Sequence, residues 1–598
     1  MKAMRQIKSV NKELPAYYIL PIILISVLVP LIVHLKVVTL DNMTFQFWTG
    51  EKDNADFFSY YKAVAIMTFS AAGLLMFFAA RYKGLLEIKK QNIYYIPILL
   101  YAILIILSAA LSKYPNTSLK GFADRYEGVF VLLSYLLILF ITINMVNSVK
   151  LMKIVIVGLL LSAAVLGTIG VFQYFDVDFF QSSVGKYLIL PEAYRRLNLT
   201  FNFGARTIYS TLYNTNYVGS YTAMLFPISL AAFMYVKKPY LKIGAGIISC
   251  LMFANWVGCR SRAGYIGSFA AVILLIILLR KSIIENIKFL APLLLAFLLV
   301  FIGMDSYADG ALSKKVLSTL TGINDNAAQN GRNAIRLRDI KLQGNKISVI
   351  CDKNTLNMEL GDNQLYFKNT EGTPLKVLNS DGNITFGDIG YDPYKLTFYS
   401  KENILQVSIQ KMSFNLFIDK SVFRILGERN ILVDKIDHPR YFGFEGHEKF
   451  ASSRGYIWSR SIPLLANNII VGGGPDTYAF QFPQHDYVGK LIALNGVSLI
   501  VDKPHNMYLQ TGINTGVLSL LAVLFLFIVY VVSSFSLYFR VKAPDTLCYI
   551  GIAIFCAALG YLVAGLANDS LVSVAPVFWA ILGVGISCNY LVGKGNAA

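Results

Sequence analysis

The sequence predicts an all-α polytopic membrane protein of about twelve transmembrane helices, with an inserted β-rich module on the extracytoplasmic side. Hydrophobic residues make up 55% of its 598 residues, above the roughly 45–50% usual in soluble proteins. Apolar runs long enough, or nearly so, to cross about 30 Å of hydrocarbon recur along the chain. One long polar stretch late in the chain alternates apolar and polar residues as strands do.

The apolar runs give the expected membrane spans. They lie near residues 17–38, 63–80, 93–111, 128–146, 154–172, 217–236, 241–258, 263–279, 289–304, 515–538, 546–567 and 571–591. The first run is long and is followed by no small-residue cleavage site, so we expect an uncleaved anchor.

Basic residues predict the orientation of the spans. Every second short loop is basic, with Lys2, Arg5, Lys8 and Lys12, then Arg81, Lys83, Lys89 and Lys90, then Lys150 and Lys153, then Lys237, Lys238 and Lys242, then Arg280 and Lys281, then Arg540 and Lys542. These loops and both termini are therefore expected in the cytoplasm. The net charge of +19 is largely this topology signal, and nucleic-acid binding is disfavoured because the large polar segment is close to charge balance.

The chain divides into three expected regions. Residues 1–304 form the first nine spans, 305–514 an extracytoplasmic loop domain, and 515–598 the last three spans. Within the loop domain, residues 335–426 read as a small all-β module, with strands expected at 347–351, 364–368, 395–399, 405–409 and 414–418. Residues 449–500 read as helical, including a helix at 453–465 that Pro463 kinks or cuts. Trp458, Ile462 and Leu465 share a face of that helix, which we expect to pack on the membrane domain.

His505 lies where the polar stretch meets the tenth span, between water and lipid. An imidazole at this seam can deprotonate a polar acceptor while a lipid-linked donor stays in the bilayer. The alternative is that His505 marks a helix start at the membrane interface, where polar residues are common.

A group of short motifs around this seam carries a family resemblance. In chain order they are Arg454-Gly-x-x-Trp458, Gly472-Gly-Gly-Pro475 and Pro504-His505-Asn506, with Gly516 after them. With the span number and the oversized late loop, they resemble the O-antigen ligase and Wzy-type polysaccharide polymerase superfamily. Asn514 and Ser519 depart from its ligase pattern, so ligase and polymerase both stay open. The strand-rich segment is not part of the common pattern.

The resemblance implies a fold, a location and a reaction. The fold would be GT-C-like, in the cytoplasmic membrane of a bacterium, and the process cell envelope biogenesis. The donor would be a glycan on undecaprenyl diphosphate and the acceptor a glycan, lipid or protein, with no cofactor. His505 and Arg260 would be catalytic, and Asn506, Asn214, Asn216 and Trp458 would hold the acceptor or support the site.

Four arginines are the expected diphosphate ligands, because the leaving group develops negative charge at the outer membrane face. They are Arg125, Arg206, Arg260 and Arg262, all expected at that face. The alternative for any one of them is an interface arginine that only anchors a helix. Asp176 and Asp178 form one Asp-x-Asp pair near the same face, but two carboxylates are more often a solvated turn, so we expect no metal.

The sequence therefore predicts an integral-membrane glycosyltransferase that transfers a lipid-linked glycan to an acceptor hydroxyl. A flippase or exporter of lipid-linked glycans is the alternative, and a surface glycan-binding receptor is a third. Transport predicts charges distributed through the spans, whereas the span interiors hold almost no Asp, Glu, Lys or Arg. A receptor does not require arginines at the membrane face.

Overall fold

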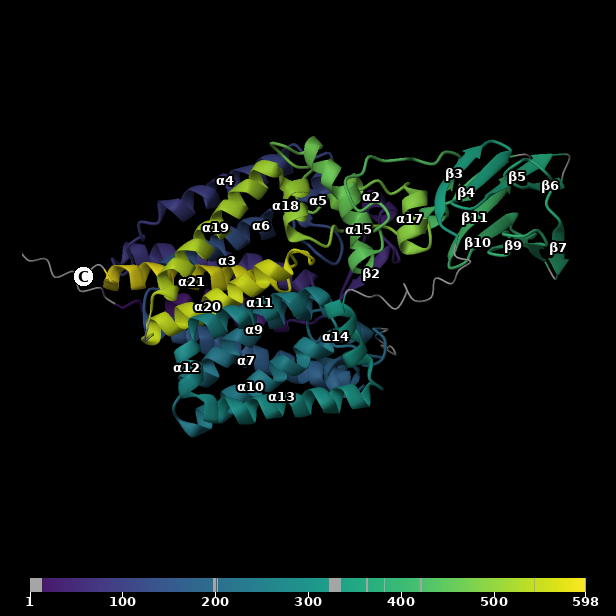
Figure 1. Ribbon diagram of the computed structural model, residues 1–598. Coiled ribbons are helices and arrows are strands. Elements are labelled where there is room, and N and C mark those ends of the chain that lie inside the picture. The colour runs from purple at the N-terminus through teal and green to yellow at the C-terminus, as the bar shows by residue number, and fades with distance from the viewer. Residues whose placement is uncertain are drawn as a thin grey trace, which may run out of the picture.

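The computed structural model of the protein describes residues 13–196, 201, 203–321, 335–361, 364–380, 382–419, 422–541 and 544–596. A bundle of helices forms one part, and a separate region of β-sheet stands beyond one end of it (Figure 1). We call that end of the bundle the module end. The C-terminal part of the chain and the short helix α12 (Arg280–Glu285) lie at the opposite end (Figure 1).

Long apolar helices build the bundle. Within the described residues, nine are long and apolar enough to cross a membrane, namely α3 (Tyr60–Tyr82), α4 (Asn92–Ala110), α7 (Val149–Tyr174), α9 (Thr215–Tyr235), α10 (Pro239–Gly258), α13 (Ile287–Tyr307), α19 (Val517–Phe539), α20 (Thr546–Ala564) and α21 (Ala575–Asn596). Helices α9, α20 and α21 are the most enclosed of these, which places them at the centre of the bundle.

Three shorter apolar segments occupy the places of the other predicted spans. Helices α6 (Val129–Met145) and α11 (Arg262–Leu278) have 17 residues each. The N-terminal segment runs through η1 (Ala16–Ile19), α1 (Leu20–Ile23), the π-helical turn η2 (Leu24–Leu28) and η3 (Val29–Leu31). A proline in α1 and another in η3 remove backbone donors, which explains why this segment is no single regular helix.

The predicted end of the first span, at residue 38, is wrong. The chain leaves the helix after Leu31, and Lys36–Thr39 form strand β1, which pairs antiparallel with β2 (Asp53–Asp56). The β-branched pair Val37-Val38 suits a strand as well as it suits a helix in lipid, and cross-strand hydrogen bonding decides the outcome.

The last three spans also differ at their ends. A separate helix, α18 (Met507–Thr515), precedes α19, and Gly516 between them has a φ of +105°. A Cβ there would come within 2.5 Å of the Ile470 carbonyl oxygen, so the break requires glycine. Helices α20 and α21 are shorter at their facing ends than predicted, and residues 565–574 form a loop between them at the module end.

Several short elements cover the module end and the loops beside it. They are α2 (Asn42–Gln46), α5 (Pro115–Lys120), η4 (Phe179–Gln181), α8 (Ser183–Ile189), η5 (Glu192–Tyr194) and α14 (Ala311–Thr321).

The β module consists of two antiparallel sheets. One has the order β3-β4-β5-β6 and the other the order β13-β12-β11-β10-β9-β8-β7. The strands are β3 (Leu337–Gln343), β4 (Lys346–Cys351), β5 (Thr355–Gly361), β6 (Gln364–Lys368), β7 (Val377–Ser380), β8 (Asn383–Phe386), β9 (Tyr394–Tyr399), β10 (Ile404–Ile409), β11 (Met412–Asp419), β12 (Val422–Leu426) and β13 (Leu432–Val433). All five predicted strands are present, and the inner faces of both sheets share one apolar core.

The predicted boundary of the β module at residue 426 is too early. Strand β13 and the 3₁₀ turn η6 (Glu428–Asn430) follow it, and side chains of α17 (Tyr487–Leu494) complete the apolar core of the sheets. Glu428 is buried, forms an ion pair with buried Lys490 and accepts a hydrogen bond from the Tyr487 hydroxyl at 3.0 Å. The module is therefore fixed to the helical half of the loop domain by a buried charge pair and by shared packing.

The helical half of the loop domain lies between the sheets and the bundle (Figure 1). Helix α15 (Phe450–Ser461) changes at Pro463 into the 3₁₀-helix η7 (Ile462–Asn467), and α16 (Tyr478–Gln481) follows. Trp458 and Leu465 join a cluster with side chains of α16, α17 and α18, all inside the predicted loop domain, whereas Ile462 does not. The three-residue period of the 3₁₀-helix η7 shifts its packed face, so Leu464 takes the place predicted for Ile462.

The predicted topology is testable with cysteine labelling. In a background without the six native cysteines, Ser380→Cys on exposed β7 should react with an impermeant thiol reagent only from outside the cell. Lys83→Cys, in an exposed loop after α3, should react only after the membrane is opened. The opposite pattern would invert the assigned orientation. Residues 1–12 and Lys542, which contribute to the charge prediction, lie outside the described residues.

Candidate functional site

His505 lies within hydrogen-bonding distance of Asp569 at the module end. Nδ1 of His505 lies 3.0 Å from Oδ2 of Asp569, whose side chain is only 1% exposed, while the His505 side chain is 29% exposed. A carboxylate on Nδ1 fixes the proton on that nitrogen and leaves Nε2 as an acceptor. Burial acts to raise the pKa of Asp569, but His505 and Lys503 hold it below its usual value, so the carboxylate is ionised.

Asn506 holds the helix start beside His505. It is the N-cap of α18, and its side-chain oxygen accepts from the backbone N–H groups of Tyr508 and Leu509 at 2.9 and 3.0 Å. Its side-chain nitrogen donates to the carbonyl of Leu566 at 2.9 Å, which ties α18 to the loop that carries Asp569. Asn506 thus supports the site.

Helix α15 supports the same segment from the loop domain. The Trp458 indole N–H donates to the carbonyl of Pro504 at 3.0 Å. Arg454 donates from Nε to the carbonyl of Ala567, also at 3.0 Å. Burial and the nearby charge of Arg262 lower the pKa of Arg454, whereas Asp569 opposes them, so Arg454 lies near both Arg262 and Asp569.

Arg125 lies in a second charge cluster, between two carboxylates. Its Nε is 2.7 Å from Asp476 and its Nη1 2.8 Å from Asp502, and the Arg125 side chain is only 3% exposed. Asp476 also accepts from the backbone N–H of Phe122 at 2.6 Å. Burial disfavours the charged guanidinium, but the two carboxylates raise the pKa of Arg125, so it stays charged.

Lys503 connects the two charge clusters. Its Nζ lies 4.0 Å from Asp502, and it stands two residues before His505. Burial acts to lower the pKa of Lys503, but Tyr217 and the carboxylates of Asp502 and Asp569 raise it. The ammonium group is therefore a fixed cation beside His505.

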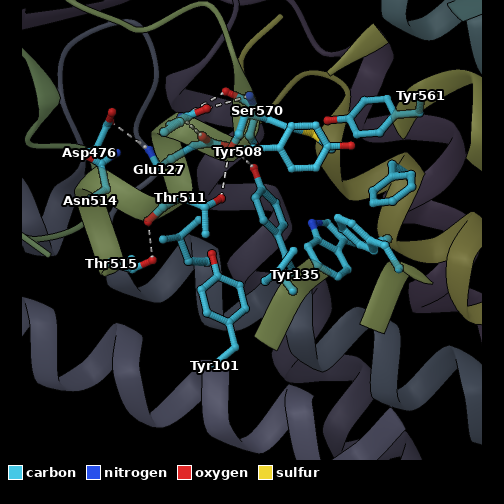
Figure 2. Close-up of a pocket in the computed structure, with 17 residues that line it drawn as sticks. Tyr101, Glu127, Tyr135, Asp476, Tyr508, Thr511, Asn514, Thr515, Tyr561 and Ser570 are labelled. Carbon is cyan, nitrogen blue, oxygen red and sulfur yellow. Dashed lines mark hydrogen bonds between the residues drawn. The ribbon is translucent and has the colours of Figure 1, made fainter. Parts of the chain in front are cut away.

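Glu127 lines a narrow cleft together with Tyr135 and Ser570 (Figure 2). Its carboxylate accepts from the hydroxyls of Tyr135 and Ser570, each at 2.8 Å, and from the amide of Gln510 at 3.0 Å. Gln510 in turn accepts from the Ser570 backbone N–H. Burial and the charge of Asp476 raise the pKa of Glu127 to about 7. Glu127 thus joins α6, α18 and the loop that carries Asp569.

Arg206 and Arg260 lie apart from His505, in a third group. Nη1 of Arg206 pairs with Asp309 at 3.0 Å, and its guanidinium lies over the Tyr307 ring. Arg260 has a φ of +54° and lies near Tyr174. Arg206 also acts electrostatically on Tyr174. The four predicted arginines therefore have different surroundings: Arg262 lies near Arg454, Arg125 is buried between carboxylates, and Arg206 and Arg260 both lie near Tyr174.

Asn214 and Asn216 shape the start of α9. Asn214 is the N-cap and accepts from the backbone N–H of Asn216 at 2.9 Å. The Asn216 side chain accepts from the Ser261 hydroxyl at 3.0 Å, and its backbone carbonyl accepts from Asn568. Asn216 therefore links the turn before Arg262 to the loop that carries Asp569.

Asp176 and Asp178 serve separate hydrogen-bond networks. Asp176 accepts from the Arg206 backbone N–H at 2.9 Å, whereas Asp178 caps η4 and accepts from the Tyr209 hydroxyl. In the part of the chain that the structure describes, no three His, Cys, Asp or Glu side chains gather as a metal site.

Comparison of the chain with models of known families, with curated proteins and with solved structures gives no match. The account of function therefore rests on the geometry of the site and on the residues themselves.

Proposed function

We propose that the protein is an integral-membrane glycosyltransferase that moves a glycan from a polyprenyl diphosphate to an acceptor hydroxyl at the module end. The observation that carries the proposal is the His505–Asp569 pair, an imidazole oriented by a buried carboxylate beside fixed cations. This arrangement suits a base that removes a proton from a hydroxyl. His505 stands at the start of α18, between the loop domain and the apolar helices.

The transfer step follows from this orientation. Nε2 of His505 takes the proton of the acceptor hydroxyl, and the acceptor oxygen bonds to the anomeric carbon of the donor sugar. The bond between that carbon and the diphosphate oxygen breaks, and the polyprenyl diphosphate leaves with the electron pair. Asp569 stabilises the imidazolium that forms, because the ion pair is strongest when His505 is charged. The proton then passes from His505 to the departing diphosphate or to water.

Fixed cations near His505 stabilise the leaving diphosphate in this proposal. Lys503 acts electrostatically on Asp569, and Arg454 lies near both Asp569 and Arg262, so these cations place positive charge close to where negative charge develops. Arg125 is already neutralised by two carboxylates, which favours a structural role for it over diphosphate binding. Arg206 and Arg260 are the less favoured candidates, because they gather around other partners.

Replacing Arg262 with Ala should weaken donor binding and turnover together, each by about tenfold or more, since one charge-assisted contact is worth about 1.5–3 kcal/mol. Arg262→Lys should recover only part of the loss, because ammonium cannot present a planar fork. Binding of labelled lipid-linked oligosaccharide and steady-state transfer measure both effects. Arg206→Ala is the matched control. An equal loss in that variant would indicate that Arg206 and Arg260 bind the diphosphate instead.

Transfer should proceed in the presence of EDTA at an unchanged rate, because Lys503 and Arg454 near Asp569 supply positive charge in this proposal. The measurement is turnover before and after chelation, with magnesium or manganese added back. A loss on chelation that the metal reverses would point to a divalent cation in the reaction, and Asp176→Asn and Asp178→Asn would then locate it.

A reconstituted transfer assay tests the proposed function against transport. Proteoliposomes would hold labelled lipid-linked oligosaccharide, with candidate glycan, lipid and protein acceptors outside. Glycosyl transfer predicts label covalently joined to an acceptor. Label that only changes leaflet, still bound to its polyprenyl carrier, would instead support a flippase.

A further inference from the structure

An outer cavity of about 200 Å³ opens beside the charge cluster of Arg125. Four segments far apart in the sequence line it, including the loop after α2, the loop before α6, the start of α9 and the segment before His505. Its aromatic wall is Phe47, Trp48, Tyr213 and Tyr217, and its polar groups include Asp124 and Lys503. A cavity needs about 10–15 Å³ to hold one water molecule, so this one has room for a much larger polar ligand.

The charges around the outer cavity nearly cancel. Arg125 and Lys503 are cations, and the carboxylates of Asp476 and Asp502 pair with them. Asp124 also lines the cavity, and burial together with the charge of the neighbouring Asp56 raises its pKa to about 7. A cavity with this balance gives no strong preference to a free anion such as phosphate.

Arg125, which lines the outer cavity, keeps one hydrogen-bond donor without a partner among the described residues. Nη2 of Arg125 is buried and makes no hydrogen bond to any described residue, although Nε and Nη1 are paired. Oδ1 of Asp124 accepts from the Asn54 amide at 2.7 Å, which fixes the carboxyl group. A buried guanidinium nitrogen without a partner is unfavourable unless a ligand or water completes it.

The aromatic wall is held in place from behind. Trp48 packs against Phe122 and Gly50, and a Cβ on Gly50 would come within 2.6 Å of the indole nitrogen. Arg429 from the β module donates to the carbonyl of Trp48 at 2.7 Å and stacks over the Phe45 ring. The β module thus holds the loop that carries this wall.

We propose that the outer cavity binds one neutral sugar ring of a glycan substrate, packing the apolar face of the ring on Trp48 while Asp124 and Arg125 hydrogen-bond its hydroxyls. Aromatic faces beside a few fixed polar groups suit a ring with one apolar face and many hydroxyls. The inference deepens the proposed function and rests on it for the identity of the glycan as substrate. Lys503, which lines the cavity, stands two residues before His505 in the chain.

Ligand-observed NMR on the full-length protein in detergent tests the proposal without any transfer reaction. The probes are D-glucose, D-galactose, N-acetyl-D-glucosamine, D-glucuronate, inorganic phosphate and glycerol. At least one neutral sugar should bind saturably with a Kd of roughly 1–10 mM, the order expected for a small ligand held by few contacts. Trp48→Ala and Asp124→Asn should each weaken that binding about tenfold or more, and Trp48→Phe should weaken it less.

The controls separate this cavity from other sites. Asp176→Asn changes a matched carboxylate outside the cavity and should leave sugar binding unchanged. Thermal unfolding of every variant verifies that the fold survives. Tighter binding of phosphate or glucuronate, no binding of any neutral sugar, or sugar binding unaffected by both cavity variants would each overturn the proposal. Transfer activity without sugar binding would overturn this inference alone, whereas sugar binding without transfer would overturn the proposed function.

Discussion

Replacing His505 with Ala should lower the rate of glycan transfer by about 10²-fold or more, the range typical of a positioned base. The affinity for the lipid-linked donor should stay unchanged, because the imidazole acts on the acceptor. Asp569→Asn should produce a loss of similar order, since the amide no longer fixes the proton on Nδ1 or stabilises the imidazolium. Turnover and donor binding, measured side by side, test both variants.

The chain offers a matched control for this pair. His438 lies 2.8 Å from Asp339 in a second histidine–aspartate pair at the β module, where the histidine is well exposed. His438→Ala should leave transfer nearly unchanged. A His505→Ala protein with near-normal transfer to its native acceptor would remove the general-base assignment and leave His505 as a marker of the helix start.

Replacing Arg125 with Ala should destabilise the protein by about 3–5 kcal/mol, because it leaves the carboxylate of Asp476 buried and unpaired. Thermal or denaturant unfolding in detergent measures the loss. Arg206→Ala should lose only about 0–1 kcal/mol, since its pair with Asp309 is 33% and 84% exposed.

A double variant identifies the cause of the Arg125 effect. Adding Asp476→Asn to Arg125→Ala should recover part of the stability, because it removes the unpaired charge and keeps an acceptor for the Phe122 N–H. If Arg125→Ala were as stable as Arg206→Ala, the buried cluster would not have the structural importance that we assign to it.

Local sequence patterns predicted much of the fold. Apolar runs marked the helices of the bundle, and the alternation in segments such as Ile404–Ile409 marked strands of the β module. The wrong predictions concern segments whose structure is determined by tertiary contacts. Val37 and Val38 form a strand because β2 pairs with them, and α17 belongs to the core of the sheets although it lies far along the chain.

The candidate site was less predictable. The seam at His505 and the support from Trp458 were visible in the sequence, but the partner of His505 was not. Asp569 meets it only because the loop after α20 folds against α18, and no spacing in the sequence encodes that contact. Arg454 stood in a recognised motif without an assigned role. Residue type likewise did not show that Arg125 is neutralised, since pairing depends on the loops that carry Asp476 and Asp502.

The most direct test of the account is the stoichiometry of one turnover. Purified protein in detergent would receive doubly labelled donor, with one label in the glycan and one in the polyprenyl diphosphate, together with an acceptor. The account predicts that wild-type protein releases one polyprenyl diphosphate for each new glycan–acceptor bond, and that His505→Ala binds the donor but forms neither product. Equal product formation by the variant, or no covalent product with wild-type protein and any acceptor class, would contradict it.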